Sequence, residues 1–98
     1  MEKSKPHHDL SQIKKLARQG SIAVVGTAMR DALNLGFELS DIIDVIMSLS
    51  RTDFYKSMTA YSNSKNWHDV YRPMTDAGQL YIKLILQDDA LVVSFKEK

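Results

Sequence analysis

The last third of the sequence holds side chains suited to chemistry on a phosphate. Tyr81 and Lys83 stand at alternate positions of the segment 79–87, and Lys96 ends the segment 90–96. A lysine supplies positive charge for phosphate oxygens, and a tyrosine supplies a ring for base stacking or a hydroxyl proton. An ordinary solvated sheet surface has the same composition, so the pattern alone leaves both interpretations open.

These two segments are predicted to pair as a hairpin around the loop 88–89. Each carries apolar residues at every second position, and a two-residue loop fixes which residues stand opposite each other. Ile82 then faces Phe95, and every side chain on their face is apolar. A shift of one residue would turn this whole face outward, so we expect it to lie on the core. The opposite face pairs Tyr81 with Lys96.

Basic and aromatic residues are interleaved between residues 51 and 72. This pattern suits RNA, because unstacked bases stack on aromatic rings while cations contact phosphates. Alternatively, some of the rings belong to the core, which we expect for at least two of Phe54, Trp67 and Tyr71. The basic residues of this stretch are Arg51, Lys56, Lys65 and Arg72, and the aromatic ones are Phe54, Tyr55, Tyr61, Trp67 and Tyr71.

The chain has three histidines, and one of them lies inside a predicted strand. This is His68, whose unperturbed pKa of about 6.5 allows proton exchange near neutral pH. A surface or hydrogen-bonded histidine is the alternative. His7, His8 and Asp9 could bind a metal by composition, but adjacent ligands near a terminus are weak evidence. We therefore predict no metal site and no cofactor.

Helices are predicted in the first half of the chain. Asp9 and Gly20 are suited to cap the two ends of a first helix, and Thr27 and Gly36 those of a second. Ser40 is suited to cap a third helix, which carries an apolar stripe.

Strands are predicted mainly in the second half. The runs 53–61 and 67–72 precede the hairpin, with a turn at 75–78, and the short run 22–25 is also β-like. Helices followed by antiparallel strands predict an α+β fold of one domain, 1–98, with N-terminal helices packed on an antiparallel sheet.

The composition excludes several classes of function. No cysteine is present, which removes disulfides, thiol catalysis and thiolate zinc sites. No apolar stretch is long enough to cross a membrane, and the segment MEKSKPHHDL is too polar for a secretory signal. We therefore expect a cytoplasmic protein with no membrane partner.

Charge is uneven along the chain, although the formal net charge is only +1. Residues 1–20 are basic, which suits nucleic acid or an acidic partner, although a solvated helix face is the commoner meaning. The third helix contains Asp41 and Asp44 and no basic residue. Phosphates would repel it, so a DNA-binding regulator that reads bases with this helix is disfavoured.

Several segments together resemble one family. The stretches DFYKSMTAY (53–61), WHDVYRP (67–73), QLYIKL (79–84) and VSFKEK (93–98), with MEKSKPH and LSQIKKL near the start, resemble the motility quorum-sensing regulator (MqsR-type) toxins of bacterial toxin–antitoxin pairs. The resemblance covers essentially the whole chain.

The resemblance implies a RelE-like bacterial ribonuclease fold and a sequence-specific mRNA endoribonuclease. Such an enzyme acts without the ribosome and prefers GC-containing triplets. It also implies a cognate antitoxin, MqsA-like, with a zinc-binding half and a DNA-binding helix-turn-helix half. Operator DNA would then be contacted only indirectly, through the antitoxin.

The family's functional residues carry over to Lys56, Tyr81 and Lys96, where this sequence matches. At position 68 the family commonly has glutamine, whereas this chain has His68. We expect metal-independent transphosphorylation, in which the lysines stabilise charge on the phosphate and Tyr81 orients the nucleotide or donates a proton. His68 would act as base or acid.

Arg72 and Lys83 are expected as further RNA-binding residues. The main alternative from another class is a non-catalytic RNA- or protein-binding module, which would retain RNA without cutting it.

Overall fold

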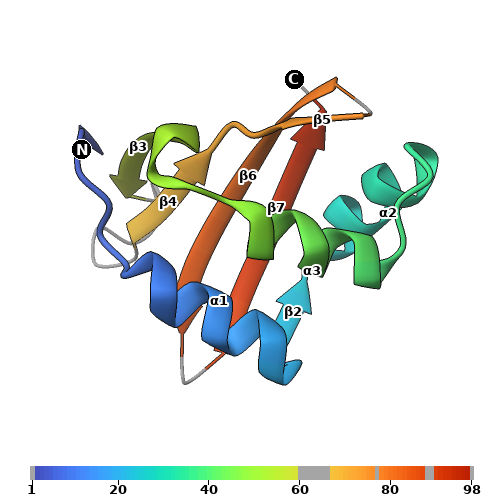
Figure 1. Cartoon of the computed structure of the whole chain (residues 1–98), viewed down its shortest axis with the longest axis horizontal. Helices are drawn as coiled ribbons and strands as arrows, with labels where there is room; N and C mark the ends of the chain where they lie inside the picture. Colours follow the sequence, from blue (N-terminus) through green and yellow to red (C-terminus); the bar gives the residue numbers. More distant parts are fainter. Residues whose placement is uncertain (1, 60–66, 77, 88–89, 98) are drawn as a thin grey trace.

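The computed structural model describes residues 2–59, 67–76, 78–87 and 90–97, and of residues 95–97 it describes the backbone alone. The described chain forms a β-sheet with helices packed on one of its faces (Figure 1). The helices are α1 (Leu10–Gln19), α2 (Gly26–Asn34), α3 (Leu39–Ser48) and the single 3₁₀ turn η1 (Arg51–Asp53). The strands are β1 (Glu2–Lys3), β2 (Ile22–Val24), β3 (Phe54–Thr59), β4 (Trp67–Tyr71), β5 (Met74–Thr75), β6 (Gly78–Gln87) and β7 (Ala90–Glu97).

The sheet is mixed, which confirms the α+β class but makes the prediction of an antiparallel sheet wrong. Its strand order is β1-β3-β4-β6-β7-β2, with β5 paired to β6 beside this path. After α1 the chain enters the edge of the sheet in the same direction as β7, so β2 and β7 pair in parallel. The Val25 N–H donates to the Val93 carbonyl at 2.9 Å, and the Leu91 N–H donates to the Ser21 carbonyl at 2.9 Å.

The predicted hairpin register is confirmed. Pairs run from Tyr81 opposite Lys96 and Ile82 opposite Phe95 down to Gln87 opposite Ala90. The strand alternation therefore places the side chains of Ile82 and its apolar neighbours toward the helices. The loop 88–89 itself lies outside the described residues.

Helix α1 begins and ends where the sequence predicts. The Asp9 carboxylate accepts a hydrogen bond from the backbone N–H of Ser11 at 3.0 Å. Gly20 ends the helix with φ of 79°, a left-handed conformation that glycine adopts without a steric penalty.

Helices α2 and α3 begin before their predicted caps. Thr27 lies inside α2, because Val25 ends the pairing of β2 with β7 and the chain turns directly into the helix. Ser40 lies inside α3, because Glu38 is the cap. The Glu38 side chain accepts from the helix, and its backbone N–H donates to the Asp41 carboxylate at 2.8 Å.

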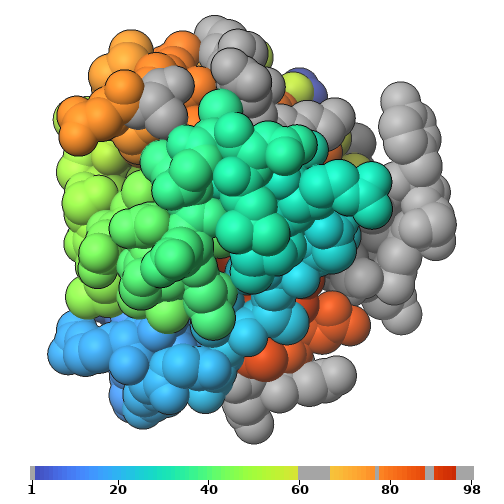
Figure 2. Space-filling view, turned by 90° about the vertical axis from the view of Figure 1, so that its right-hand side faces the viewer, coloured from blue at the N-terminus to red at the C-terminus, as the bar shows by residue number. Residues whose placement is uncertain are grey.

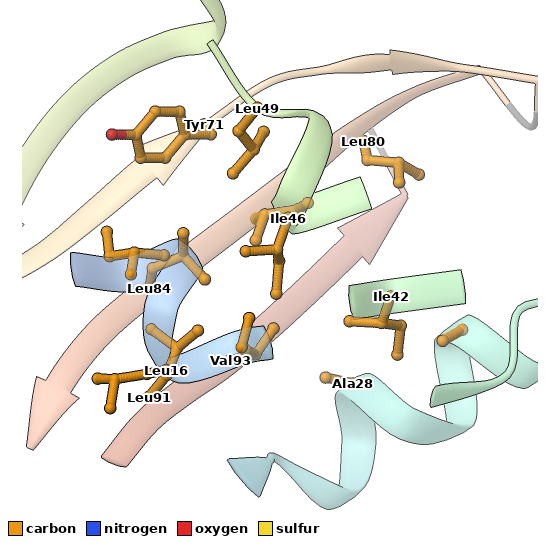
Figure 3. Close-up of a cluster of buried hydrophobic side chains, with 14 residues drawn as sticks. Leu16, Ala28, Ile42, Ile46, Leu49, Tyr71, Leu80, Leu84, Leu91 and Val93 are labelled. Carbon is orange, nitrogen blue, oxygen red and sulfur yellow. The ribbon is translucent and has the colours of Figure 1, made fainter. Parts of the chain in front are cut away.

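The core lies between the helices and one face of the sheet (Figure 3), with Ile46 of α3 and Leu16 of α1 directed toward Leu84 and Val93 of the hairpin. Tyr71 is buried in this core and Phe54 packs against it, so the expectation for two of the three rings is confirmed. The buried apolar residues of this core are Ile13, Leu16, Ala17, Ala28, Ala32, Ile42, Ile46, Leu49, Tyr71, Leu80, Ile82, Leu84, Leu91 and Val93. Val70 is also buried, but it lies on the opposite face of the sheet.

The three α-helices occupy one side of the molecule, and Figure 2 shows α2 and α3 forming a layer above α1. Within the described part of the chain, no helix covers the opposite face of the sheet. We call this face the outer face. None of the described helices is long and apolar enough to cross a membrane.

Candidate active site

Strand pairing brings the predicted chemical side chains to the outer face. Val70 of β4 stands opposite Lys83 of β6 on one side and opposite Lys56 of β3 on the other. These three residues therefore share a face, and it is the face that alternates with the core residue Ile82. The alternation of β6 also turns Tyr81 outward beside them.

His68 also lies on the outer face. The sequence alone could not decide which face of the sheet His68 occupies. It is two residues before Val70 in β4 and stands opposite Met58 of β3. Burial lowers the pKa of His68 below its usual value, and the positive charge of Lys83 and the neighbouring His8 lower it further. The shift favours the neutral imidazole, which is the form that can accept a proton.

A β-bulge at the start of β3 adds a residue to the site. Phe54 pairs with Tyr71 and Lys56 pairs with Val70, so Tyr55 is the extra residue between them. Phe54 packs edge-on against the buried Tyr71 at 5.5 Å between ring centroids. Because the bulge interrupts the alternation, Tyr55 turns to the outer face along with Lys56.

Tyr55 is the centre of a cluster of rings and cations. The guanidinium of Arg72 lies 3.8 Å from the Tyr55 ring centroid, and the Lys56 ammonium lies 5.3 Å from it. Tyr55 and Tyr81 meet edge to face at 6.3 Å, and the Lys83 ammonium lies 6.0 Å from the Tyr81 ring. Cations beside exposed rings can hold a phosphate while a base stacks on the ring.

Lys56 carries a full positive charge. Its ammonium donates to the Glu2 carboxylate at 2.5 Å, and the Lys56 side chain is 25% exposed. This hydrogen bond raises the pKa of Lys56 and lowers the pKa of Glu2. Lys56 is thus suited to stabilise negative charge and unsuited to act as a base.

The structure brings together most of the predicted site residues. Lys56, Tyr81, Arg72 and Lys83 interact directly or through Tyr55, and His68 is close enough to Lys83 for its pKa to be affected. Lys96 stands opposite Tyr81 in the register, while its side chain lies outside the described atoms.

Not every basic residue of the interleaved stretch joins this site. Arg51 lies on the helix side of the sheet, where a cavity of about 500 Å³ is lined by Arg51, Lys5, His8 and Tyr71, among others. Burial raises the pKa of Tyr71 to about 12, so its phenol stays protonated there. Lys65 and Tyr61 lie outside the described residues.

The two N-terminal histidines are held in place by strand β4. The backbone N–H groups of His7 and His8 donate to the Asp69 carboxylate at 2.9 and 2.8 Å. The His7 ring stacks on Trp67 at 5.2 Å, and the His8 ring contacts the Trp67 carbonyl at 2.9 Å. Instead of a loose terminus, residues 2–9 form a strap, which pairs with β3 at the edge of the sheet through β1 and reaches the inner strand β4 at His7 and His8.

Two comparisons relate this chain to known proteins. The family model described as motility quorum-sensing regulator, toxin of MqsA, matches residues 5–97. Over 98 residues the chain is 48% identical to the mRNA interferase toxin MqsR of Escherichia coli (strain K12), and the match covers the full length of both chains.

Proposed function

Because the chain belongs to the motility quorum-sensing regulator family of toxins, we propose that it is an mRNA interferase that cleaves RNA on the outer face of its sheet. The observation that carries the location is the cluster of Lys56, Tyr55, Arg72, Tyr81 and Lys83 on that face. It combines cations suited to phosphate with the exposed ring of Tyr55 and the partly exposed ring of Tyr81.

The reaction we infer is internal transphosphorylation without a metal. The ribose 2′-oxygen attacks the adjacent phosphorus, the bond to the 5′-oxygen breaks, and the products carry a 2′,3′-cyclic phosphate and a 5′-hydroxyl. Neutral His68 accepts the 2′-hydroxyl proton, and Tyr81 donates a proton to the departing 5′-oxygen. Lys56 stabilises charge on the nonbridging oxygens, with Lys96 as its predicted partner.

Further features of the proposal come from the resemblance. They are a RelE-like fold, cleavage of free mRNA without the ribosome, a preference for GC-containing triplets and a cytoplasmic location. Helices on one sheet face and a cationic opposite face support the RelE-like assignment.

The experiment that tests the activity is digestion of a defined mRNA by the purified chain, with the 5′ ends of the products mapped. We expect cuts at GC-containing triplets, 5′-hydroxyl ends and full activity with a chelator present. Products with a 5′-phosphate, or loss of activity on chelation, would contradict the mechanism. RNA that is retained but not cut would favour the non-catalytic binding module.

The family description pairs this kind of toxin with an antitoxin. We propose that the cognate antitoxin is MqsA-like, with a zinc-binding half and a helix-turn-helix half, and that operator DNA is reached only through it. Expression of the chain alone should arrest growth, and co-expression with the antitoxin should restore it. Binding of operator DNA by the purified chain alone would contradict the indirect role.

A further inference from the structure

Strand β1 places a carboxylate on the cationic outer face. Glu2 stands opposite Met58, which in turn stands opposite His68, so the three side chains share that face. Among the described strand residues on the outer face, Glu2 is the single acidic one. It contacts Lys56, the lysine on which the proposed chemistry depends.

Glu2 contacts the Lys56 ammonium, which is the group that an RNA phosphate would also contact. The Glu2 carboxylate accepts from the Lys56 ammonium at 2.5 Å, and both residues line a hollow of about 360 Å³ together with Tyr55, Ser4 and Lys3. A carboxylate and a phosphate are both acceptors for an ammonium, and two anions at one cation repel each other.

Glu2 is held near Lys56 but is easy to displace. Asp69 fixes the strap at His7 and His8, while β1 itself is only two residues long and lies at the sheet edge. The Glu2 side chain is 59% exposed, so water can solvate the carboxylate once it leaves.

We propose that Glu2 is an electrostatic gate, which occupies the phosphate position of Lys56 in the free protein and is displaced when RNA binds. The gate rests on the proposed function of the outer face. Glu2 lowers the affinity for RNA, because the ion pair between Glu2 and Lys56 must break before Lys56 can pair with a phosphate. After displacement Glu2 no longer contacts Lys56, so the rate at saturating RNA is independent of it.

The test compares Glu2→Gln with the parent and with Asp44→Asn. Glutamine keeps the size of the side chain and removes its charge. Asp44 is an exposed residue of α3 on the helix side, so its variant controls for the same change in net charge. The probe is a labelled 2′-O-methyl RNA oligonucleotide, which binds but lacks the attacking hydroxyl, and anisotropy gives its Kd at low and high salt.

For Glu2→Gln we expect the Kd at low salt to fall about two- to fivefold, the range of an exposed ion pair, and the gain to shrink at high salt. Asp44→Asn should gain less, and single-turnover cleavage at saturating RNA should be unchanged in Glu2→Gln. A Kd no lower than that of Asp44→Asn overturns the gate. A lower cleavage rate at saturation also overturns it, since Glu2 would then position Lys56 during the reaction.

These outcomes are separate from those for the proposed function. A parent protein that binds the probe but does not cut RNA refutes the nuclease proposal, while the comparison of Kd values still decides the gate. A parent that does not bind the probe refutes both proposals.

Discussion

Replacing Asp69 by alanine should release the N-terminal strap from the sheet. Asp69 is fully buried and accepts three hydrogen bonds, from the backbone N–H groups of His7 and His8 and from the Ser57 hydroxyl. Ser57 is also fully buried, so in the variant its hydroxyl loses a partner where water has no access.

The expected loss follows from these three donors. A buried donor left without a partner costs about 1–3 kcal/mol, and hydrogen bonds to charged groups lie at the upper end of the scale. The N–H groups of His7 and His8 are only partly buried and can turn to water, and removing a buried carboxylate relieves its own desolvation. We therefore expect Asp69→Ala to lower the free energy of unfolding by about 2–4 kcal/mol.

Urea unfolding measures this loss. The single tryptophan, Trp67, stacks on His7, so its fluorescence reports the strap as well as the fold. Hydrogen exchange of residues 2–9 should rise in Asp69→Ala. The control is Ser57→Ala, which removes one donor and leaves the carboxylate, and it should cost about 1 kcal/mol. Equal losses in the two variants, with unchanged exchange in the strap, would refute the role of Asp69.

Two further predictions concern the hairpin and the site. Ile82→Ala should lower the free energy of unfolding by about 2–5 kcal/mol, because Ile82 is fully buried between sheet and helices; a loss too small to resolve in urea would contradict the packing. The single-turnover cleavage rate should fall toward acid with a midpoint below the ordinary histidine pKa of about 6.5, because the lowered pKa keeps His68 an unprotonated base until more acidic pH. His68→Gln should still cleave without this acid limb, whereas Lys56→Ala should lose most activity at every pH. A pH profile of His68→Gln that overlays the parent would make His68 a positioning group.

The hairpin could be predicted because its information is local. Alternation of apolar residues decides the core face, and the two-residue loop decides the register. The direction of β2 could not be read in this way, since Ile22–Val24 is equally apolar in either orientation. β2 pairs with β7 in parallel because of the position and direction in which the chain leaves α1. That position depends on how α1 packs in the whole fold.

The sequence can predict which side chains share a face of the sheet only where strand alternation is regular. The bulge at Tyr55 breaks that alternation, so a regular strand would have turned Tyr55 away from Lys56. The face of His68 depended on the connection after Arg72, where β5 folds back on β6 and the pairing of Tyr71 with Ile82 follows. The Glu2–Lys56 contact spans 54 positions and involves a two-residue strand, for which no local pattern exists.

Asp69 holds one end of the strap at His7 and His8, and Glu2 lies at the other end. The energetic coupling between Asp69 and Glu2 can be measured. If Asp69 holds the strap so that Glu2 stays near Lys56, then Asp69→Ala lets Glu2 leave Lys56 even without RNA. Removing the Glu2 charge should therefore matter less in that background. In a double-mutant cycle, the gain in affinity for the 2′-O-methyl RNA probe from Glu2→Gln should shrink toward that of Asp44→Asn once Asp69 is alanine. The measurement must be made without denaturant. The temperature is one at which Asp69→Ala and the double variant with Glu2→Gln both remain folded by far-ultraviolet circular dichroism. An undiminished gain would mean that β1 pairs with β3 without help from Asp69, and that the strap positions Glu2 through its own two-residue strand.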